Sequence, residues 1–409
     1  MIIPQHNIIG QPVLGRPVHY NPVNISIEKG RMPPRQTEVD LPKSLNFIAD
    51  HSGCGFWRLF WPSDQLNSRM QSVVMSICMM IGDENFYKPL KTVRIQRQAT
   101  PQQLEFVKWL VQIKQTIGFN LIYEIDDVMF YDDIPEYNHF KPGFSPHEIR
   151  ESSKLIMQSC DEITCTNKYI ADYYASKTGN PRTTIIPNYL PKWWAGNMFD
   201  EKKVSISFDK NKKKPRVLYA GSGAHADVDG RCNGKDDFYH INEIVRKTIN
   251  KYQWVFYGVF PRALKDLVDS GKIEFHQWTK LYDYPEKMAS LKCQVLVAPL
   301  QDNVFNRAKS DIKITEAGAF GIVPVCQDLE PYERASYKFK SGDEMIDQID
   351  AALKHKDTFM KSIRKNRIET EKLFLENPEN IGKWEELYNH NSYRHPERKF
   401  LNEFNKNFS

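Results

Sequence analysis

The sequence predicts an α/β protein with two open, doubly wound domains whose largely parallel sheets face a central cleft. Three observations support this prediction. The chain has 409 residues, which is too long for one ordinary domain. Short apolar runs alternate with amphipathic helical stretches in two separate series. A polar, lysine-rich stretch at 191–215 separates the two series and predicts a linker between the domains.

Composition narrows the class of protein further. Apolar residues make up 41% and charged residues 26% of the chain, as in ordinary globular proteins. The first residues lack the features of a signal peptide, and we find no apolar run long enough to span a membrane. The seven cysteines are scattered and form no Cys-x-x-Cys pair. We therefore expect a cytoplasmic protein with reduced thiols. Its net charge of +5 permits a phosphate-bearing ligand without requiring one.

The expected organisation has five parts. Prolines crowd residues 1–43 and exclude helical or strand periodicity there, so we expect an extended arm. A first domain follows over 44–190 and, after the linker, a second over 216–375. The charged, helical residues 376–409 form a C-terminal segment for which we consider packing back onto the first domain.

The first series contains clear sequence signals for strands and helices. Its strands are expected at 44–50, 71–80, 92–96, 120–130, 161–166 and 184–186. Its helices are expected at 101–117, 147–159 and 168–177. The first of these helices is the best defined, because Pro101 suits a first turn and Gly118 suits a C-terminal cap.

The second series repeats the pattern. Strands are expected at 216–220, 254–257, 273–275, 294–298 and 322–325. Helices are expected after a cap at Asp236 or Asp237, and at 261–270, 284–291 and 310–320. Ligands of such sheets bind at the carboxyl ends of the strands, so the loops that follow strands are the candidate site.

Two such loops lie in the first domain. Gly53 and Gly55 allow close backbone approach at a helix N-terminus, with Arg58 nearby, which suits an anion or simply a tight turn. A third glycine is missing, which argues against a dinucleotide fingerprint and a dehydrogenase. In Glu124-Ile-Asp126-Asp127, strand alternation predicts Glu124 and Asp126 on one face and Asp127 on the other. These acids suit a metal pair, a hydroxyl-binding or acid–base role, or loop ordering.

The second domain supplies a glycine-rich loop and a helix N-terminus. Gly221 and Gly223 follow the strand at 216–220 and suit a phosphate, with His225 available for a phosphoryl or sugar oxygen. Further along, Arg307 and Lys309 approach a helix N-terminus near Ser310, which predicts a diphosphate site.

The helix that follows carries two further candidates. Lys313 and Glu316 are three residues apart and therefore share a helix face. A carboxylate in the position of Glu316 can accept both hydroxyls of a ribose.

The run from Asn306 through Glu316 to Gly321 and Pro324 resembles the nucleotide-sugar signature of retaining glycosyltransferases with the GT-B fold, which has two Rossmann-like domains. The resemblance implies that Glu316 holds the donor ribose. It assigns the donor phosphates to the following residues: Arg307, Lys309, Lys313, Gly221 and Gly223. It also implies that Gly53, Gly55 and Arg58 face the donor or acceptor. Many members carry a glutamate where this chain has Ala308, and the stretch 227–235 resembles an insertion.

The resemblance implies transfer of a sugar from a nucleotide-sugar donor, for which we expect a UDP-sugar, with retention of anomeric configuration and no essential metal. Arg307 and Lys309 would stabilise the leaving diphosphate. Asp126 and Asp127 would then act on the acceptor side or hold the structure together.

The acceptor is open between two classes. The narrowly favoured acceptor is a 5-hydroxymethylated pyrimidine in double-stranded phage DNA. This acceptor would place the enzyme in the host cytoplasm. The positive net charge of the chain and the lysines at 210–214 fit DNA. The other is a bacterial surface or lipid-linked glycan. A catalytically inactive nucleotide-sugar-binding module is a further alternative, because of Ala308.

Overall fold

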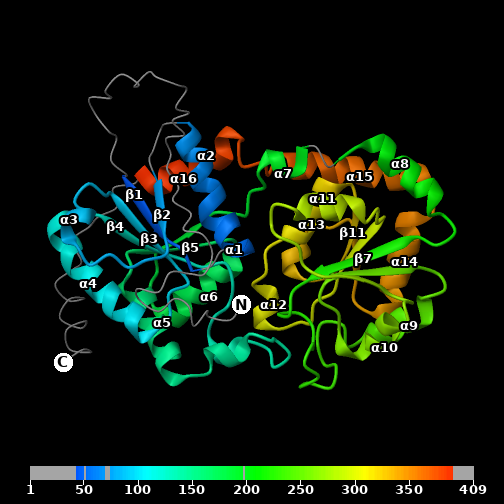
Figure 1. Cartoon of the computed structure of the whole chain (residues 1–409), viewed down its shortest axis with the longest axis horizontal. Coiled ribbons are helices and arrows are strands. Elements are labelled where there is room, and N and C mark those ends of the chain that lie inside the picture. Colours follow the sequence, from blue (N-terminus) through cyan, green and yellow to red (C-terminus); the bar gives the residue numbers. More distant parts are fainter. Residues whose placement is uncertain (1–42, 50–51, 70–73, 197–198, 390–409) are drawn as a thin grey trace, which may run out of the picture.

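The computed structural model describes residues 43–49, 52–69, 74–196 and 199–389. Within these residues the chain forms two domains, each with a six-stranded parallel sheet and helices on both sides of it (Figure 1). The prediction of two doubly wound α/β domains is confirmed. The predicted arm lies outside the described residues except for Lys43, as does the C-terminal segment after Asn389.

The first sheet has the order β2-β1-β3-β4-β5-β6. Its strands are β1 (Ser44–Phe47), β2 (Val74–Ile77), β3 (Thr92–Gln96), β4 (Asn120–Glu124), β5 (Glu162–Cys165) and β6 (Thr183–Ile185). The order reverses between β1 and β3, and such a reversal opens a crevice at the carboxyl ends of the strands. The residues that follow β1 and β3 therefore flank this crevice, and those that follow β4 lie on the neighbouring strand.

The three helices predicted for the first domain begin and end close to the predicted positions, as α4 (Pro101–Ile117), α5 (His147–Ser159) and α6 (Lys168–Thr178). The domain also contains three helices whose bounds were not predicted: α1 (Gly53–Gly55), α2 (Trp61–Ser68) and α3 (Glu84–Tyr87). At α4, the Thr100 side chain accepts a hydrogen bond from the backbone of Gln103 and Gln103 reciprocates. Gly118 ends α4 with φ of 88°, a left-handed value that favours glycine.

The second sheet has the order β12-β11-β10-β7-β8-β9. Its strands are β7 (Arg216–Gly221), β8 (Gln253–Gly258), β9 (Glu274–His276), β10 (Val295–Ala298), β11 (Val323–Gln327) and β12 (Tyr337–Phe339). The reversal lies between β7 and β10, so the loops after Gly221 and Ala298 flank the crevice. The short edge strand β12 was not predicted.

The remaining helices include two within the predicted linker. They are α7 (Lys192–Gly196), α8 (Glu201–Lys210), α9 (Asn242–Thr248), α10 (Lys265–Asp269), α11 (Tyr284–Ser290), α12 (Val304–Arg307), α13 (Ile312–Phe320), α14 (Gly342–Leu353), α15 (Lys356–Glu371) and α16 (Pro378–Asn389). The linker is thus mostly helical, and α8 packs against α15 through Phe208 and Phe359, whose rings are 4.7 Å apart. Helix α9 begins later than predicted, because Asp236 and Asp237 bind loop partners instead of capping it.

The C-terminal part of the chain crosses back to the first domain. Leu190 and Phe374 pair in a short parallel bridge where the two crossing segments meet. Beyond this bridge, α16 lies beside α2 on the first domain (Figure 1). The Tyr388 hydroxyl donates to Asn46 on β1 at 2.8 Å. Helix α16 is therefore part of the packing of the first domain.

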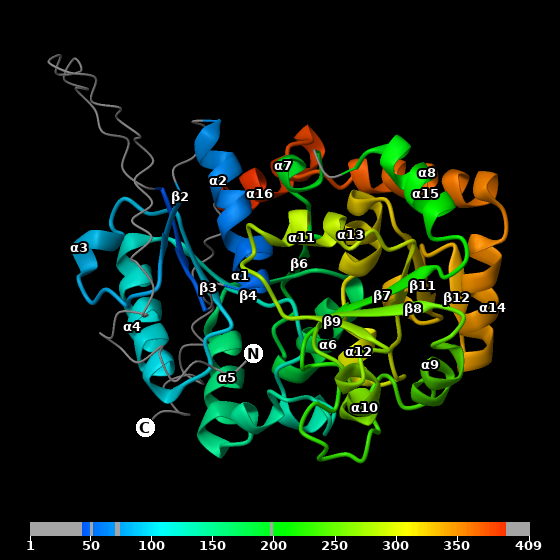
Figure 2. The same ribbon diagram turned by 45° about the vertical axis from the view of Figure 1, so that its right-hand side comes forward.

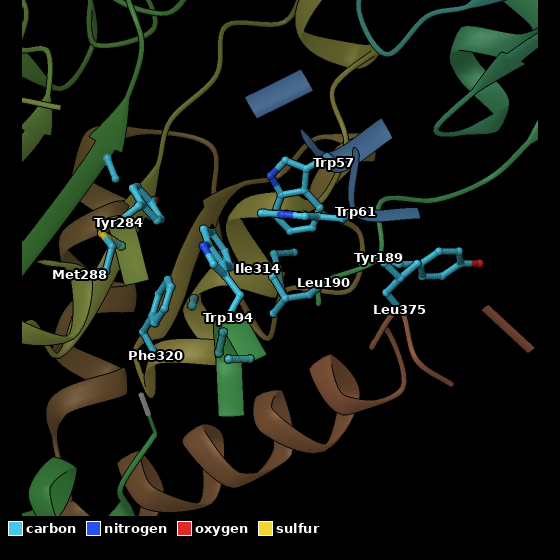
Figure 3. Close-up of a cluster of buried hydrophobic side chains, with 14 of the residues drawn as sticks. Trp57, Trp61, Tyr189, Leu190, Trp194, Tyr284, Met288, Ile314, Phe320 and Leu375 are labelled. Carbon is cyan, nitrogen blue, oxygen red and sulfur yellow. The ribbon is translucent and has the colours of Figure 1, made fainter. Parts of the chain in front are cut away.

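An apolar cluster that contains residues of both domains lies at their junction (Figure 3). Trp194 of α7 stands at its centre, with ring centroids 5.5 Å from Trp57 of the first domain and 5.2 Å from Tyr284 of the second. Both sides of this junction are thus held by buried aromatic area. No helix within the described ranges is both long and apolar enough to cross a lipid bilayer.

Candidate active site

The carboxyl edges of the two sheets face each other, and an ion pair joins them (Figure 2). Asp127 follows β4 in the first domain, and Lys309 precedes α13 in the second. The Lys309 Nζ donates to both carboxylate oxygens of Asp127, at 2.9 and 2.8 Å. Lys309 also lies 3.6 Å from the centroid of the Phe305 ring. Two predicted site residues, 182 positions apart, therefore meet at the domain interface.

Arg97 completes this charged cluster and was missed from the sequence. Its guanidinium lies 3.2 Å from Asp126 and 3.5 Å from Asp127. Arg97 directly follows β3, at the reversal of strand order, and has φ of 53°. A non-glycine residue in this left-handed region is strained, and such strain concentrates at functional sites. The available signal was an arginine immediately after a predicted strand.

The two aspartates of the cluster have opposite pKa shifts. Burial raises the pKa of Asp126, and the neighbouring Asp127 adds to this, while Arg97 opposes it. For Asp127, burial would also raise the pKa, but Lys309 and Arg97 hold it below its ordinary value. Asp127 is therefore the firmly ionised member of the pair.

Glu124 does not join this cluster, which corrects the predicted grouping with Asp126. It is fully buried between Arg58 and Arg94, and the Arg58 Nε donates to its Oε1 at 2.5 Å. Burial alone would raise the pKa of Glu124, but the two guanidinium groups hold it below its ordinary value. Strand β4 ends at Glu124, so strand alternation does not extend to the aspartates.

The structure also corrects the prediction that Arg58 faces a ligand. Its side chain is 0% exposed and also donates to the Ile186 carbonyl at 2.5 Å and to Asn188 at 3.2 Å. A guanidinium held in this way stabilises the first domain and has no surface open to a ligand. Gly53 and Gly55 form α1 rather than a loop, and Arg58 follows in a π-helix over Phe56–Phe60. No atom approaches the Cβ position of Gly53 within 4 Å.

Arg307 pairs with two carboxylates of its own domain. Its guanidinium donates to Asp302 with Nε at 2.5 Å and Nη2 at 2.6 Å, and it also pairs with Glu330. These contacts form a surface ion-pair network in which two carboxylates neutralise the cation. Of the three cations predicted for the donor phosphates, Lys309 lies in the charged cluster at the domain interface.

Glu316 lies in α13, beneath an aromatic stack. Its Oε2 accepts hydrogen bonds from Lys313 Nζ at 3.0 Å and from the Tyr284 hydroxyl at 3.1 Å. The Tyr284 ring is stacked on Trp194 at 5.2 Å and on Trp278 at 5.8 Å. Both donors bind the same oxygen, so the carboxylate keeps acceptor capacity for a ligand hydroxyl. The predicted pairing of Lys313 with Glu316 is present.

The glycine-rich loop after β7 contacts the first domain. The backbone N–H of His139 donates to the carbonyl of Gly223 at 2.9 Å. A Cβ at Gly223 would lie 3.1 Å from the His139 side chain, so the small residue permits this approach. Gly221 ends β7 and stands beside Gly258, whose φ of 100° requires glycine.

His225 is oriented by a buried carboxylate. Its Nδ1 lies 2.7 Å from Asp237, which also accepts from the Tyr137 hydroxyl at 2.7 Å and from Asn306 at 2.7 Å. Tyr137 belongs to the first domain, so Asp237 connects the domains as well as positioning the histidine. The residues expected as an insertion are ordered by Asp227, whose carboxylate accepts backbone hydrogen bonds from Arg231, Cys232 and Gly234.

Comparisons with known proteins identify the fold. The sequence matches no protein-family model and no curated protein. Anabaena HepE, solved with UDP and glucose, aligns over 85% of this chain and 100% of its own, at 10% identity and a TM-score of 0.57. The same protein with UDP-glucose aligns over 84% of this chain and 99% of its own, at 10% identity and 0.56. WaaG, a glycosyltransferase involved in lipopolysaccharide biosynthesis, aligns over 85% and 99%, at 13% identity and 0.52.

At sequence identities this low, structural similarity shows the fold alone. The two parallel six-stranded sheets of this chain fit the two-domain architecture of these neighbours. The chain therefore has the GT-B fold, with two Rossmann-like domains.

Proposed function

We propose that this protein is a glycosyltransferase that uses a UDP-sugar donor. The observation that carries the proposal is the position of Glu316 in the second turn of α13, seven residues after Lys309. A carboxylate for ribose and a cation for diphosphate thus flank one helix N-terminus, which itself favours an anion. The structural neighbour HepE was solved with UDP and with UDP-glucose.

The residues support a charge-stabilised departure of the diphosphate. Lys309 is only 16% exposed, so its charge acts in a largely dry environment, where electrostatic stabilisation is strongest. Asp127 holds the Lys309 ammonium at the domain interface before a donor binds. Asp126, with its raised pKa, is placed to exchange a proton with an acceptor hydroxyl. We propose retention of configuration, with no step that depends on a metal.

The acceptor proposed first is a glycan or lipid-linked sugar, and the structure supplies the reason for preferring it to DNA. The lysines that fitted DNA, at 210–214, directly precede β7 and so lie at the amino edge of the second sheet. The six residues of β7 separate them from the carboxyl edge, by roughly 17 Å at about 3.3 Å per residue. They are therefore poorly placed to guide a duplex to Lys309. A hydroxymethylated base in DNA stays the alternative acceptor.

Titration calorimetry with UDP tests the donor site. We expect Glu316→Gln to weaken UDP binding about tenfold or more, because a ribose hydroxyl loses a charged acceptor worth about 1.5–3 kcal/mol. The matched control is Glu386→Gln, an exposed glutamate of α16, which should bind UDP like the unmodified protein. Equal affinity of Glu316→Gln and the control would contradict the assignment.

Mass spectrometry then separates the acceptor classes. UDP-glucose and other nucleotide sugars are incubated with glycan acceptors, unmodified duplex DNA and hydroxymethylated duplex DNA. A mass increase of one sugar on a glycan alone supports the proposal. An increase on hydroxymethylated DNA alone supports the alternative, and UDP binding without any transfer supports an inactive binding module.

A further inference from the structure

Two asparagines of the first domain bind a short segment of the second domain. The Asn167 Nδ2 donates to the carbonyl oxygens of Ala308 and Lys309, at 3.1 and 3.2 Å. The Asn188 Nδ2 donates to the Ser310 hydroxyl at 3.1 Å. The bound residues lie between α12 and α13, and α12 lies beside α6 of the first domain in Figure 2. Neither asparagine has a task in the reaction proposed above.

The two asparagines and Asp127 follow neighbouring strands. Asp127 comes after β4, Asn167 after β5 and Asn188 after β6, and these three strands are adjacent in the first sheet. Parallel strands bring their carboxyl ends to one edge of a sheet. The segment that contains Lys309 therefore lies along that edge, held by one side chain from the end of each strand.

Both asparagines are themselves held in place by the first domain. The Asn167 Oδ1 accepts from the Ile170 backbone at 3.0 Å and so caps the N-terminus of α6. The Asn188 Oδ1 accepts from the buried Arg58 guanidinium at 3.2 Å. In each side chain the oxygen binds the first domain, while the nitrogen reaches the second domain. The amides are therefore fixed in the orientation that the second domain requires.

We propose that Asn167 and Asn188 position the donor-binding groups of the second domain, an inference that rests on the proposed function. Asn167 fixes the main chain of Lys309 through its carbonyl oxygen, while the side chain can still turn from Asp127 to a diphosphate. Asn188 fixes Ser310, which lies two residues before α13, the helix whose N-terminus favours an anion. The first domain therefore helps to build a donor site whose cation and helix lie in the second domain.

Titration calorimetry with UDP on the full chain tests this proposal. Asn167→Ser keeps a hydroxyl that can cap α6, but this hydroxyl is too short to reach the two carbonyl oxygens of the second domain. We expect the variant to bind UDP about tenfold more weakly, because the hydrogen bonds that fix Lys309 are lost. Its affinity for uridine, followed by nuclear magnetic resonance, should stay within about twofold, because the nucleoside carries no diphosphate.

Asn180→Ser is the matched control. Asn180 precedes β6 at the amino edge of the first sheet, and its Nδ2 also donates to two carbonyls, those of Met157 and Cys160, at 3.3 and 3.0 Å. Its Oδ1 likewise accepts a backbone N–H, from Arg182 at 3.1 Å. The control should lose stability to urea much as Asn167→Ser does, yet bind UDP like the unmodified protein.

The comparison of UDP with uridine separates positioning from a general loosening of the protein. Equal UDP affinity of Asn167→Ser and the unmodified protein would overturn the proposal alone. So would equal losses of UDP and uridine affinity, or an equal loss of UDP affinity in the control. No UDP binding by the unmodified protein would overturn the proposed function as well. If Asn167→Ser does not fold, Asn188→Ala decides the question, with the same loss expected for UDP but not for uridine.

Discussion

Lys309 is the residue on which the interface and the proposed chemistry converge. Its ammonium binds Asp127 in the structure, and the proposed donor would offer a diphosphate to the same ammonium. The two anions therefore compete for one cation. Arg97 binds the same aspartate, so Asp127 keeps a partner when Lys309 turns to the donor.

This competition predicts that removing one charged residue of the site strengthens UDP binding. Asp127→Asn should tighten UDP binding about fivefold, because Lys309 no longer leaves an ion pair worth about 1 kcal/mol. Lys309→Met should weaken it. Titration calorimetry on both variants measures the two effects. Weaker UDP binding by Asp127→Asn would show that the aspartate supports the bound donor directly.

Asp236 gives a pH-dependent prediction. Burial raises its pKa from 3.8 to about 7, although it accepts backbone hydrogen bonds from Asp227 and Phe238. The folded state therefore keeps a proton that the unfolded state has released, and stability falls as pH rises from about 4 to 7. Between about pH 5 and pH 8 this group should cost about 3 kcal/mol.

Urea unfolding at the two pH values, with Asp236→Asn for comparison, checks this expectation. The variant should lose less stability over the same interval, because an amide does not titrate. The same loss in both proteins would assign the pH dependence to other groups.

Among the elements, α16 has the clearest structural task. Its Trp384 ring lies 4.5 Å from the Arg94 guanidinium and 5.0 Å from that of Arg58. These two cations share one carboxylate, Glu124, so the buried group carries an excess positive charge. The face of the indole compensates for this charge through cation–π contacts, which are strongest when desolvated.

We therefore expect Trp384→Ala to destabilise the protein by about 3–5 kcal/mol, through the cavity and the exposed cations. Urea denaturation followed by circular dichroism measures the change. Glu386→Gln on the exposed side of the same helix should stay within about 0.5 kcal/mol. A small effect of Trp384→Ala would mean that α16 is only loosely attached.

At the scale of the whole molecule, the domains share apolar packing as well as charge. Trp194 contacts aromatic rings of both domains, including Trp57 at 5.5 Å, Trp61 at 5.6 Å and Phe320 at 5.6 Å. A shared core of this kind couples the folding of its two sides. The junction of Leu190 with Phe374 lies in the same cluster.

We expect a single calorimetric unfolding transition for the unmodified protein. Trp194→Ala should lower the free energy of unfolding by about 3–5 kcal/mol and separate the transition into two, because the shared contacts are lost. Differential scanning calorimetry reports both effects. Two transitions already present in the unmodified protein would show that the domains fold independently.

Local signals in the sequence predicted most of the helices and strands. They failed where an element depends on contacts with distant parts of the chain. Helix α4 is bounded as its proline and glycine indicated, and β3 matches its predicted residues. The strand expected over 120–130 is shorter, because apolar character continues past the point where pairing with β3 and β5 stops. Likewise, the sequence did not predict helices in the linker, because its many lysines obscure the apolar face of α8 that packs against α15.

The candidate site could be predicted less completely. The sequence placed Lys309, Asp127, Lys313 and Glu316 in loops or on a helix suited to a ligand, and the structure groups them in two pairs. It also suggested Arg58 and Arg307 as open cations, and both proved to be occupied by carboxylates. A charged side chain looks the same in sequence whether it is buried in a pair or free at a surface.

The sequence by itself determined the two alternating series and the two ends of α4, because these depend on residues within a few positions of each other. Only the tertiary structure decided which charges meet. Arg58 lies 66 residues from Glu124, and Lys309 lies 182 residues from Asp127. Such pairs form because the sheets bring strand ends together, and electrostatic energy depends on distance in space rather than along the chain.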